Sequence, residues 1–451
     1  MTKGPIGQAI IRFAIPLFFG NLFQQLYNTA DTFIVGKLIG NDALAAVSST
    51  GSLVFLLVGF FNGISLGGGV VVSQRWGAKN YSAMRKAIHT NLTLSLIFAG
   101  ILTLAGTLLA PQILVWMDCP DDILPLSTQY IQVYFAGSVG MVMYNCCMGI
   151  MQAVGDSKHP LMYLIISSCM NVVLDVVFIA LFKWEVAGAA IATIISQIFS
   201  VILCLTRLMR VNAEYRVSVK SLGIDWETAK LVLKYGLPTG LQNSVISIAN
   251  VMVQSNVNAF GKMAMAGNGA YAKLEGFAFL PVTCFTSAIT TFVGQNLGAG
   301  EYDRVKKGAR FGILCSMAIA EIVGIILFFG SEFLIGLFTD EAESVMYGVM
   351  KSHSCSLFFF MLAAAHCFSA VMRGAGKSTV PMLTMLICWC VVRVAALSIL
   401  VPIYHSIHIV NWIFPVTWTL SVIVLGIYYF KVDWIGGFIR KHSPKADTIE
   451  G

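Results

Sequence analysis

The sequence predicts an all-α integral membrane protein, with twelve transmembrane helices in two pseudo-symmetric six-helix lobes around a central cavity. Composition, the number of apolar segments and an internal repeat predict this fold. Of the 451 residues, 57% are hydrophobic and only 11% are charged, whereas soluble globular chains carry roughly 25% charged residues. Each membrane helix takes roughly 20 apolar residues, so the chain has room for about a dozen.

Twelve hydrophobic segments follow one another along the chain. They lie at residues 10–36, 46–74, 87–110, 123–147, 160–182, 187–209, 231–259, 266–294, 309–330, 345–371, 380–402 and 408–430. With a cytoplasmic N-terminus, the cytoplasmic stretches hold 23 of the 29 Lys and Arg residues, and the connections after the third and ninth segments are acidic. The positive-inside rule then places both termini in the cytoplasm.

The two halves of the chain resemble each other at one offset. The motif Q-x-x-G-A-x-x-Y at 74–81 recurs at 295–302, and G-x-S-x-x-P at 155–160 recurs at 376–381, both 221 residues later. Six segments in each half give both halves the same orientation, as in transporters whose repeats are related by an axis along the membrane normal. The expected units are an N-terminal lobe (1–209), a cytoplasmic linker (210–229), a C-terminal lobe (230–430) and a cytoplasmic tail (431–451).

The first segment carries a polar stripe around a carboxylate. At 100° per residue its polar side chains fall within less than half the helix circumference, including Gln24, Tyr27, Asn28 and Asp31. A carboxylate at bilayer depth costs roughly 2.5–3.5 kcal/mol on the mildest scales. Asp31 therefore indicates an ion or proton site, and a structural carboxyl bonded to neighbouring polar groups is the alternative.

A second acidic position lies in the fifth segment. Asn171 and Asp175 are four residues apart and share one helix face. Small residues in the sixth segment allow close helix approach and can bring Thr193 near them. Together with Asp31 these side chains form an oxygen set suited to Na⁺, or a carboxyl pair that shares protons. The residues alone leave both readings open.

The acids have no counterparts in the second half. Val253 occupies the position that matches Asp31, and Ala396 the position that matches Asp175. A symmetric scaffold with an asymmetric polar site indicates a coupling site confined to the N-terminal lobe.

Other polar or conformational positions complete the candidate set. Tyr130 and Asn145 in the fourth segment could line the lobe interior or form ordinary interhelical hydrogen bonds, and Glu275 in the eighth segment could line the cavity. Pro16 removes the helix hydrogen bond to the carbonyl of Arg12 and invites a kink. It is either a hinge below Asp31 or a passive bend.

Several function classes are not indicated. The chain shows no P-loop, nucleophile elbow, H-E-x-x-H motif or dinucleotide fingerprint in strand–helix context. We therefore expect no enzyme activity and no cofactor apart from H⁺ or Na⁺ as coupling ion. The net charge of +7 lies mainly in the predicted cytoplasmic stretches, so it does not indicate nucleic-acid binding.

At these positions the chain resembles the multidrug and toxic compound extrusion (MATE) transporters. The similar stretches are the first segment from Ile15 to Gly36, Q-R-W-G-A with Q-N-L-G-A, N-V-V-L-D at 171–175 and V-A-G-A-A-I-A-T at 186–193. The resemblance implies a proton- or sodium-coupled antiporter that exports organic cations by alternating access between two lobes. The expected partners are an amphipathic cationic substrate and the bilayer of the plasma membrane, with the protein as a monomer.

The resemblance also assigns roles to individual residues. Asp31, Asn171, Asp175 and Thr193 match the cation or proton site of the DinF-type branch. Tyr27, Tyr130 and Asn145 match polar residues that line that lobe, and Pro16 matches the bend of its first helix. The NorM-type branch also uses carboxylates on segments seven and ten, but this chain has no Asp or Glu at 230–260 or 345–371. The DinF-like branch is therefore favoured.

Two rival functions follow from the same features. A lipid-linked oligosaccharide flippase of the wider superfamily would need a basic cavity for pyrophosphate, whereas the N-terminal lobe offers acids. A non-transporting membrane receptor or scaffold would need neither the twofold repeat nor buried acids. Both patterns favour the antiporter.

The topology predicts that Ser218, in the linker, faces the cytoplasm. In a cysteine-free background, Ser218→Cys should resist an impermeant thiol reagent added to intact cells and react once the cells are permeabilised. Glu341→Cys, in the acidic connection after the ninth segment, is the matched control and should react from outside. Labelling of Ser218→Cys in intact cells would overturn the predicted orientation.

Overall fold

The computed structural model describes residues 1–39, 41–116 and 122–442, and every regular element in these ranges is helical. The first half contains α1 (Ile6–Leu38), α2 (Asn41–Gly77), α3 (Tyr81–Trp116), α4 (Leu124–Ala136), α5 (Ser138–Ala153), α6 (Lys158–Val176), the π-helical η1 (Val177–Leu181) and α7 (Glu185–Arg210). The prediction of an all-α fold is confirmed.

After the short η2 (Val219–Ser221), the second half repeats the pattern. It contains α8 (Trp226–Asn258), α9 (Lys262–Gly298), α10 (Tyr302–Gly336), α11 (Ala342–Cys355), η3 (Ser356–Phe358), α12 (Phe359–Gly374), α13 (Thr379–Met385), the π-helical η4 (Leu386–Val392), α14 (Arg393–Tyr404), α15 (Ile407–Lys431) and α16 (Trp434–His442).

Most of the twelve predicted segments are long and apolar enough to cross a membrane. Ten spans meet this criterion in the described residues, and an eleventh does so if α4 and α5, bent by 47° at Gly137, form one span. The remaining segment, 231–259, corresponds to α8, a 33-residue helix outside that set. Polar side chains such as Gln242, Asn243 and Gln254 lower its hydropathy.

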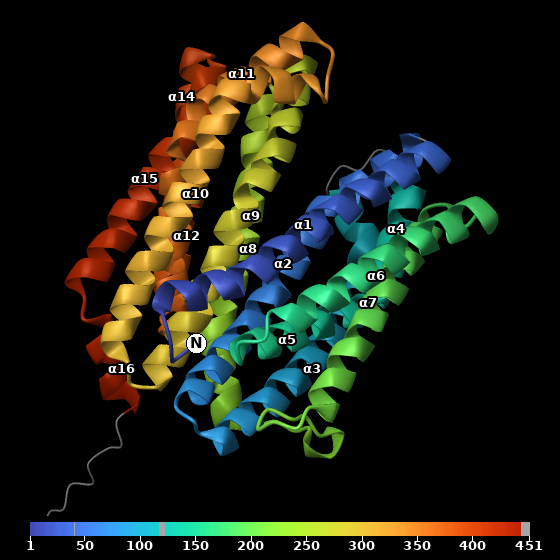
Figure 1. Ribbon diagram of the computed structural model, residues 1–451. Helices are drawn as coiled ribbons and strands as arrows, with labels where there is room; N and C mark the ends of the chain where they lie inside the picture. The colour runs from blue at the N-terminus through green and yellow to red at the C-terminus, as the bar shows by residue number, and fades with distance from the viewer. Residues whose placement is uncertain (40, 117–121, 443–451) are drawn as a thin grey trace, which may run out of the picture.

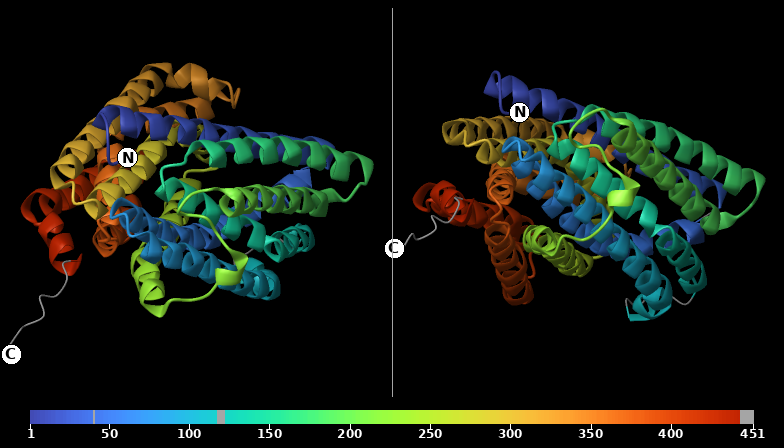
Figure 2. Two further views of the ribbon diagram at one scale, coloured as in Figure 1. Left: turned by 60° about the horizontal axis from the view of Figure 1, so that its bottom comes forward. Right: turned by 90° about the horizontal axis from the view of Figure 1, so that it is seen from below.

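The helices form two groups, which confirms the two-lobe prediction. Figure 1 shows α1–α7 on one side and α9–α15 on the other, converging toward the end where the N-terminus lies and diverging toward the other end. The views in Figure 2 keep the same separation. We call the end where the groups converge the closed end.

Glycines bring α2 and α8 into backbone contact between the lobes. A Cβ added at Gly63 would lie 2.2 Å from the nitrogen of Gly240, and one at Gly67 would lie 2.3 Å from the nitrogen of Gly236. Small residues at matching positions allow membrane helices to approach this closely. A side chain at either position would force the lobes apart.

At the closed end, the sequence repeat becomes a symmetric contact. Gln74 Nε2 donates to the carbonyl oxygen of Gly374 at 2.9 Å, and Gln295 Nε2 donates to that of Ala153 at 2.6 Å. Both donors and both acceptors are related by the offset of 221 residues. We call these two contacts the inter-lobe hydrogen-bond pair.

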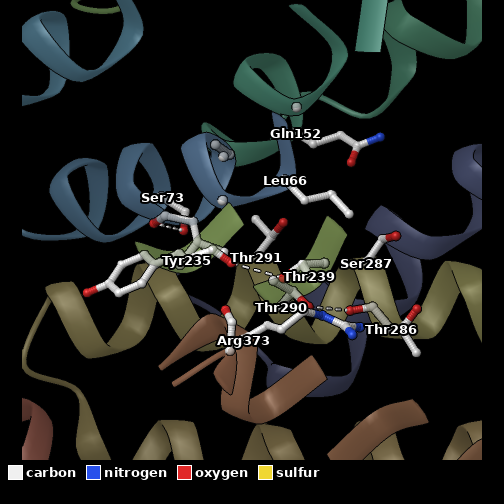
Figure 3. A pocket seen from close by; sticks show the side chains of 16 residues that line it. Leu66, Ser73, Gln152, Tyr235, Thr239, Thr286, Ser287, Thr290, Thr291 and Arg373 are labelled. Carbon is white, nitrogen blue, oxygen red and sulfur yellow. Dashed lines mark hydrogen bonds between the residues drawn. The ribbon is translucent and has the colours of Figure 1, made fainter. Parts of the chain in front are cut away.

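A cavity of about 100 Å³ lies beside this pair (Figure 3). Its walls come from both lobes, with residues of α2 and α5 on one side and residues of α8, α9 and α12 on the other. The lobes therefore meet at the closed end around a small cavity.

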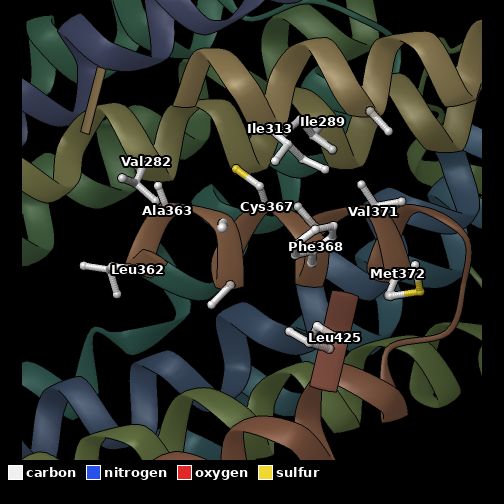
Figure 4. Packing of buried hydrophobic residues seen from close by; sticks show 14 of the residues in the cluster. Val282, Ile289, Ile313, Leu362, Ala363, Cys367, Phe368, Val371, Met372 and Leu425 are labelled. Carbon is white, nitrogen blue, oxygen red and sulfur yellow. The ribbon is translucent and has the colours of Figure 1, made fainter. Parts of the chain in front are cut away.

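Each lobe has a hydrophobic core of its own. In the C-terminal lobe, Ile289 of α9, Ile313 of α10, Cys367 of α12 and Leu425 of α15 pack together (Figure 4). In the N-terminal lobe, separate clusters join α2 with α3 and α5. The lower part of α1 differs, because its residues from Ile10 to Leu17 pack against α9 of the other lobe.

The predicted linker is packed against α3. The Ser218 amide donates to His89 Nε2 at 3.1 Å, and the Asp225 amide donates to Thr90 Oγ1 at 3.1 Å. Asp225 also caps α8 by accepting from the Thr228 amide at 2.9 Å. Hydrogen bonding to Thr228 lowers the pKa of the Asp225 carboxyl. These contacts hold the connection between the lobes on the surface of the first lobe.

The predicted tail begins as a packed helix. Trp434, Ile435 and Phe438 of α16 are buried against the C-terminal core, and Trp434 Nε1 donates to the carbonyl of Tyr429 at 3.2 Å. Residues 443–451 of the predicted tail lie outside the described residues. The exact limits predicted for the lobes and the linker remain predictions.

The closed end predicts a steric test at Gly298. A Cβ there would lie 1.9 Å from the carbonyl oxygen of Gln74, so Gly298→Ala should destabilise the closed end by about 1–3 kcal/mol, the usual cost of overpacking. Thermal unfolding in detergent should show a lower midpoint. Gly100→Ala, where nothing lies within 4 Å of the added Cβ, is the control and should unfold like the wild type. Equal midpoints for both variants would contradict the described contact.

Candidate functional site

Asp31 and Asp175 meet inside the N-terminal lobe. Asp31 lies on α1, and Asp175 lies on α6, directly before the π-helical segment η1. Asp175 is completely buried, and the two carboxyl groups are close enough to interact electrostatically. Irregular π-helical turns are frequent at functional sites. The structure therefore brings the two predicted acids together from helices that are far apart in sequence.

Asn171 and Thr193 lie next to each other across α6 and α7. The Asn171 amide donates to Thr193 Oγ1 at 3.5 Å, and Thr193 donates to the carbonyl of Ala189 at 3.1 Å. The amide nitrogen of Asn171 is thus engaged, and its amide oxygen remains available as an acceptor. Small residues on α7 make this approach possible, as the sequence predicted.

Several buried oxygens of this cluster have no donor. Asp31 Oδ1, both carboxylate oxygens of Asp175 and Asn171 Oδ1 are buried without a hydrogen-bond partner among the described residues. No described Lys or Arg forms an ion pair with either carboxylate. Burying such groups without compensation is costly. The arrangement can be completed by a proton shared between the carboxyl groups or by a hard cation.

Two tyrosines lie beside the carboxylates in apolar surroundings. Tyr27 of α1 and Tyr130 of α4 are both close enough to interact electrostatically with Asp31. Tyr130 is 8% exposed and packs with Ile179 and Val186. The low polarity of these neighbours strengthens any charge interaction within the cluster. We call Asp31, Asn171, Asp175, Thr193, Tyr27 and Tyr130 the carboxylate cluster.

Other predicted site residues are placed differently. Gln24 and Asn28 lie on α1 with exposed side chains. The Asn145 amide donates to the carbonyl of Met141, one turn earlier on α5, at 2.9 Å. Glu275 lies on α9 in the C-terminal lobe, away from the carboxylate cluster. The structure thus gathers one part of the predicted set, with Gln24 close enough to bond to Tyr27, and leaves Asn145 and Glu275 outside it.

The C-terminal lobe contains a buried basic pair close to Glu275. Lys351 is 4% exposed and Arg393 is 1% exposed, and both interact electrostatically with Glu275. Lys351 Nζ lies 3.8 Å from the centre of the Phe414 ring, and Arg393 donates to Thr417 Oγ1 at 2.7 Å. Cation–π and hydrogen-bond contacts of this kind stabilise buried cations.

Lys351 was not singled out by the sequence reasoning. Its signal was available, because it is the one Lys or Arg within the predicted segment 345–371 and it occupies the position that matches Tyr130 at the offset of 221. The C-terminal lobe therefore has a buried lysine where the N-terminal lobe has a tyrosine.

The positions that match the two acids are apolar, in agreement with the sequence comparison of the halves. Val253 and Ala396 belong to one hydrophobic cluster with Val257, Leu397 and Val401. A carboxylate pair is thus replaced by hydrocarbon packing in the second lobe.

Pro16 lies where α1 changes its packing partners. It is buried, and the residues around it from Ile10 to Leu17 contact α9 of the C-terminal lobe. Asn21 still reaches Thr283 of α9 at 3.1 Å, whereas Asp31 faces α6 of its own lobe. The missing hydrogen bond at Pro16 therefore lies below the carboxylate cluster, within the part of α1 held by the other lobe.

Comparisons with known proteins agree with this architecture. The sequence model of the MatE family matches residues 16–177 and 238–398, one match in each half. The probable multidrug resistance protein YoeA of Bacillus subtilis is 28% identical over 438 residues, which cover 95% of this chain and 94% of the relative.

Solved structures show the same fold. A MOP superfamily transporter from Pyrococcus furiosus superposes with a TM-score of 0.90 at 22% identity, covering 97% of both chains. A multidrug resistance MATE family transporter of the MOP superfamily in its outward-facing conformation gives a TM-score of 0.89 at 22% identity, covering 97% of this chain and 98% of the other.

Proposed function

The chain belongs to the MatE family, and on this premise we propose that it is a secondary active antiporter that exports amphipathic organic cations in exchange for H⁺ or Na⁺. The observation that carries the proposal is the carboxylate cluster. Its buried oxygens lack donors among the described residues, and its acids have apolar counterparts in the other lobe. A site that a proton or a cation can complete suits ion coupling.

The coupling we propose is competition for one negative site. A cationic substrate in the N-terminal lobe is attracted by the Asp31 and Asp175 carboxylates, and a proton or Na⁺ bound there removes that attraction. The ion then favours the arrangement of the lobes that binds it more tightly. The resulting change in the equilibrium between the two arrangements cannot exceed the difference in their affinities for the ion. Alternating opening of the two membrane sides converts the competition into exchange.

The proposed setting is the plasma membrane, with both termini and the closed end in the cytoplasm. The basic stretches at 75–86, 207–234 and 296–310 all lie at the closed end in Figure 1. Arg75 and Arg85 donate to Thr228 and Glu214 of the second stretch, and Arg304 of the third donates to the carbonyl of Gly4. This supports the orientation that the positive-inside rule predicts. A monomer in contact with lipid is proposed as the working form, and the DinF-like branch remains the favoured assignment.

Removing either carboxylate should abolish coupled export. In proteoliposomes, Asp31→Asn and Asp175→Asn should each lose gradient-driven transport of a fluorescent organic cation while remaining inserted and folded. Glu321→Gln is the matched control at membrane depth, because Glu321 accepts a hydrogen bond from the Phe360 amide at 3.3 Å and glutamine can keep that bond. Gradient-driven transport at the wild-type rate in both aspartate variants would show that the site assignment is wrong.

A hinge at Pro16 predicts a separate phenotype. Pro16→Ala restores the helix hydrogen bond to the carbonyl of Arg12, so α1 should bend less when the carboxylate cluster binds its ion. The variant should bind substrate with the wild-type affinity but lose the change in affinity caused by Na⁺ or by pH. The measurement is substrate binding in detergent with and without each ion. An unchanged ion effect in Pro16→Ala would leave Pro16 as a passive bend.

A further inference from the structure

The cavity at the closed end contains a guanidinium group without an anionic partner. Arg373, in the last turn of α12, is among the residues that line this cavity (Figure 3). No ion pair or side-chain hydrogen bond joins it to another residue in the described part of the chain. A cation near a helix C-terminus is favourable, but this does not explain why Arg373 lines a space between the lobes.

The other interior arginine of this lobe, Arg393, has hydrogen-bond and ring partners for its guanidinium group. Arg393 makes two hydrogen bonds to Thr417 Oγ1, at 2.7 and 3.2 Å, and lies over the rings of Trp389 and Phe414. Arg373 has no such set of contacts in the described structure. Its donors are therefore available to something inside the cavity.

A second buried donor faces the same cavity. Ser378 is 2% exposed, and its Oγ is buried without a hydrogen-bond partner among the described residues. Two other hydroxyl groups of the wall are already engaged, since Thr239 and Thr290 donate to the carbonyls of Tyr235 and Thr286. An unpaired hydroxyl and an unpaired guanidinium in the wall of one cavity point to a ligand that accepts hydrogen bonds and carries negative charge.

Gln152 of the N-terminal lobe lines the cavity from the opposite side. It occupies the position that matches Arg373 at the offset of 221, and its amide lines the same cavity. The volume of about 100 Å³ is well below the roughly 300–1,000 Å³ of pockets that take drug-sized ligands. A small inorganic ion with a little water fits this space.

We propose that the cavity is a binding site for a small inorganic anion, such as chloride, held by Arg373 and Ser378 of the C-terminal lobe and Gln152 of the N-terminal lobe. Because the walls come from both lobes, the complete site exists only when the closed end is closed. The anion thus binds this arrangement better than an open one and stabilises it. The site is separate from the carboxylate cluster and does not depend on the coupling ion.

Chloride titration of the purified full-length protein tests the site. At constant ionic strength, with gluconate as the replacing anion, the thermal unfolding midpoint of the wild type should rise saturably with chloride. Arg373→Gln should lose this response. Arg310→Gln removes an exposed charge at the same end of the molecule and should keep it. Bromide diffused into crystals should give an anomalous peak beside the Arg373 guanidinium.

Two further variants keep the test decisive if Arg373→Gln does not fold. Arg373→Lys retains the charge but not the planar fork, and Ser378→Ala removes only the hydroxyl group, so each should need several-fold more chloride for the same shift. A wild type that does not respond to chloride would overturn the proposal. So would chloride responses in Arg373→Lys and Ser378→Ala that equal the wild-type response, because the cavity would then hold water alone.

Discussion

Polar groups at membrane depth must find partners within the protein, and this constraint shapes both lobes. In the C-terminal lobe two buried cations find such partners, since Lys351 lies on the Phe414 ring and Arg393 is bonded to Thr417. The N-terminal lobe leaves it open, because Asp31 and Asp175 face each other with buried oxygens that no described donor reaches. Two buried cations of one lobe are thus paired within the protein, whereas the carboxylates of the other lack donors, and we propose that a proton or a cation completes them.

Symmetry and asymmetry have separate roles in this molecule. The repeat gives matched contacts where the lobes meet, with Gln74 and Gln295 each bonded to a carbonyl of the other lobe. Departures from the repeat confine the paired acids to the N-terminal lobe, because the position that matches Asp31 in the C-terminal lobe is the apolar Val253. A closed end built from equivalent halves can open and close as a unit, and we propose that the ion-sensitive chemistry stays in one half.

The sequence predicted the fold class and the carboxylate cluster because both leave regular patterns. Apolar segments and the offset of 221 residues need no knowledge of packing, and acids within apolar segments are conspicuous. It did not predict the bend at Gly137 or the small cavity around Arg373, since both depend on how distant helices pack. Arg373 follows a predicted span directly, as expected of a cytoplasmic arginine, and only the structure shows that it lines a space between the lobes.

The central claim is that substrate and coupling ion use one pair of carboxylates. The most direct measurement is the number of protons released, or Na⁺ ions displaced, when one organic cation binds the purified protein in weakly buffered detergent solution. The wild type should release protons or Na⁺ when the organic cation binds, and the double variant Asp31→Asn with Asp175→Asn should release neither. Substrate binding by the wild type without release of either ion would contradict the account.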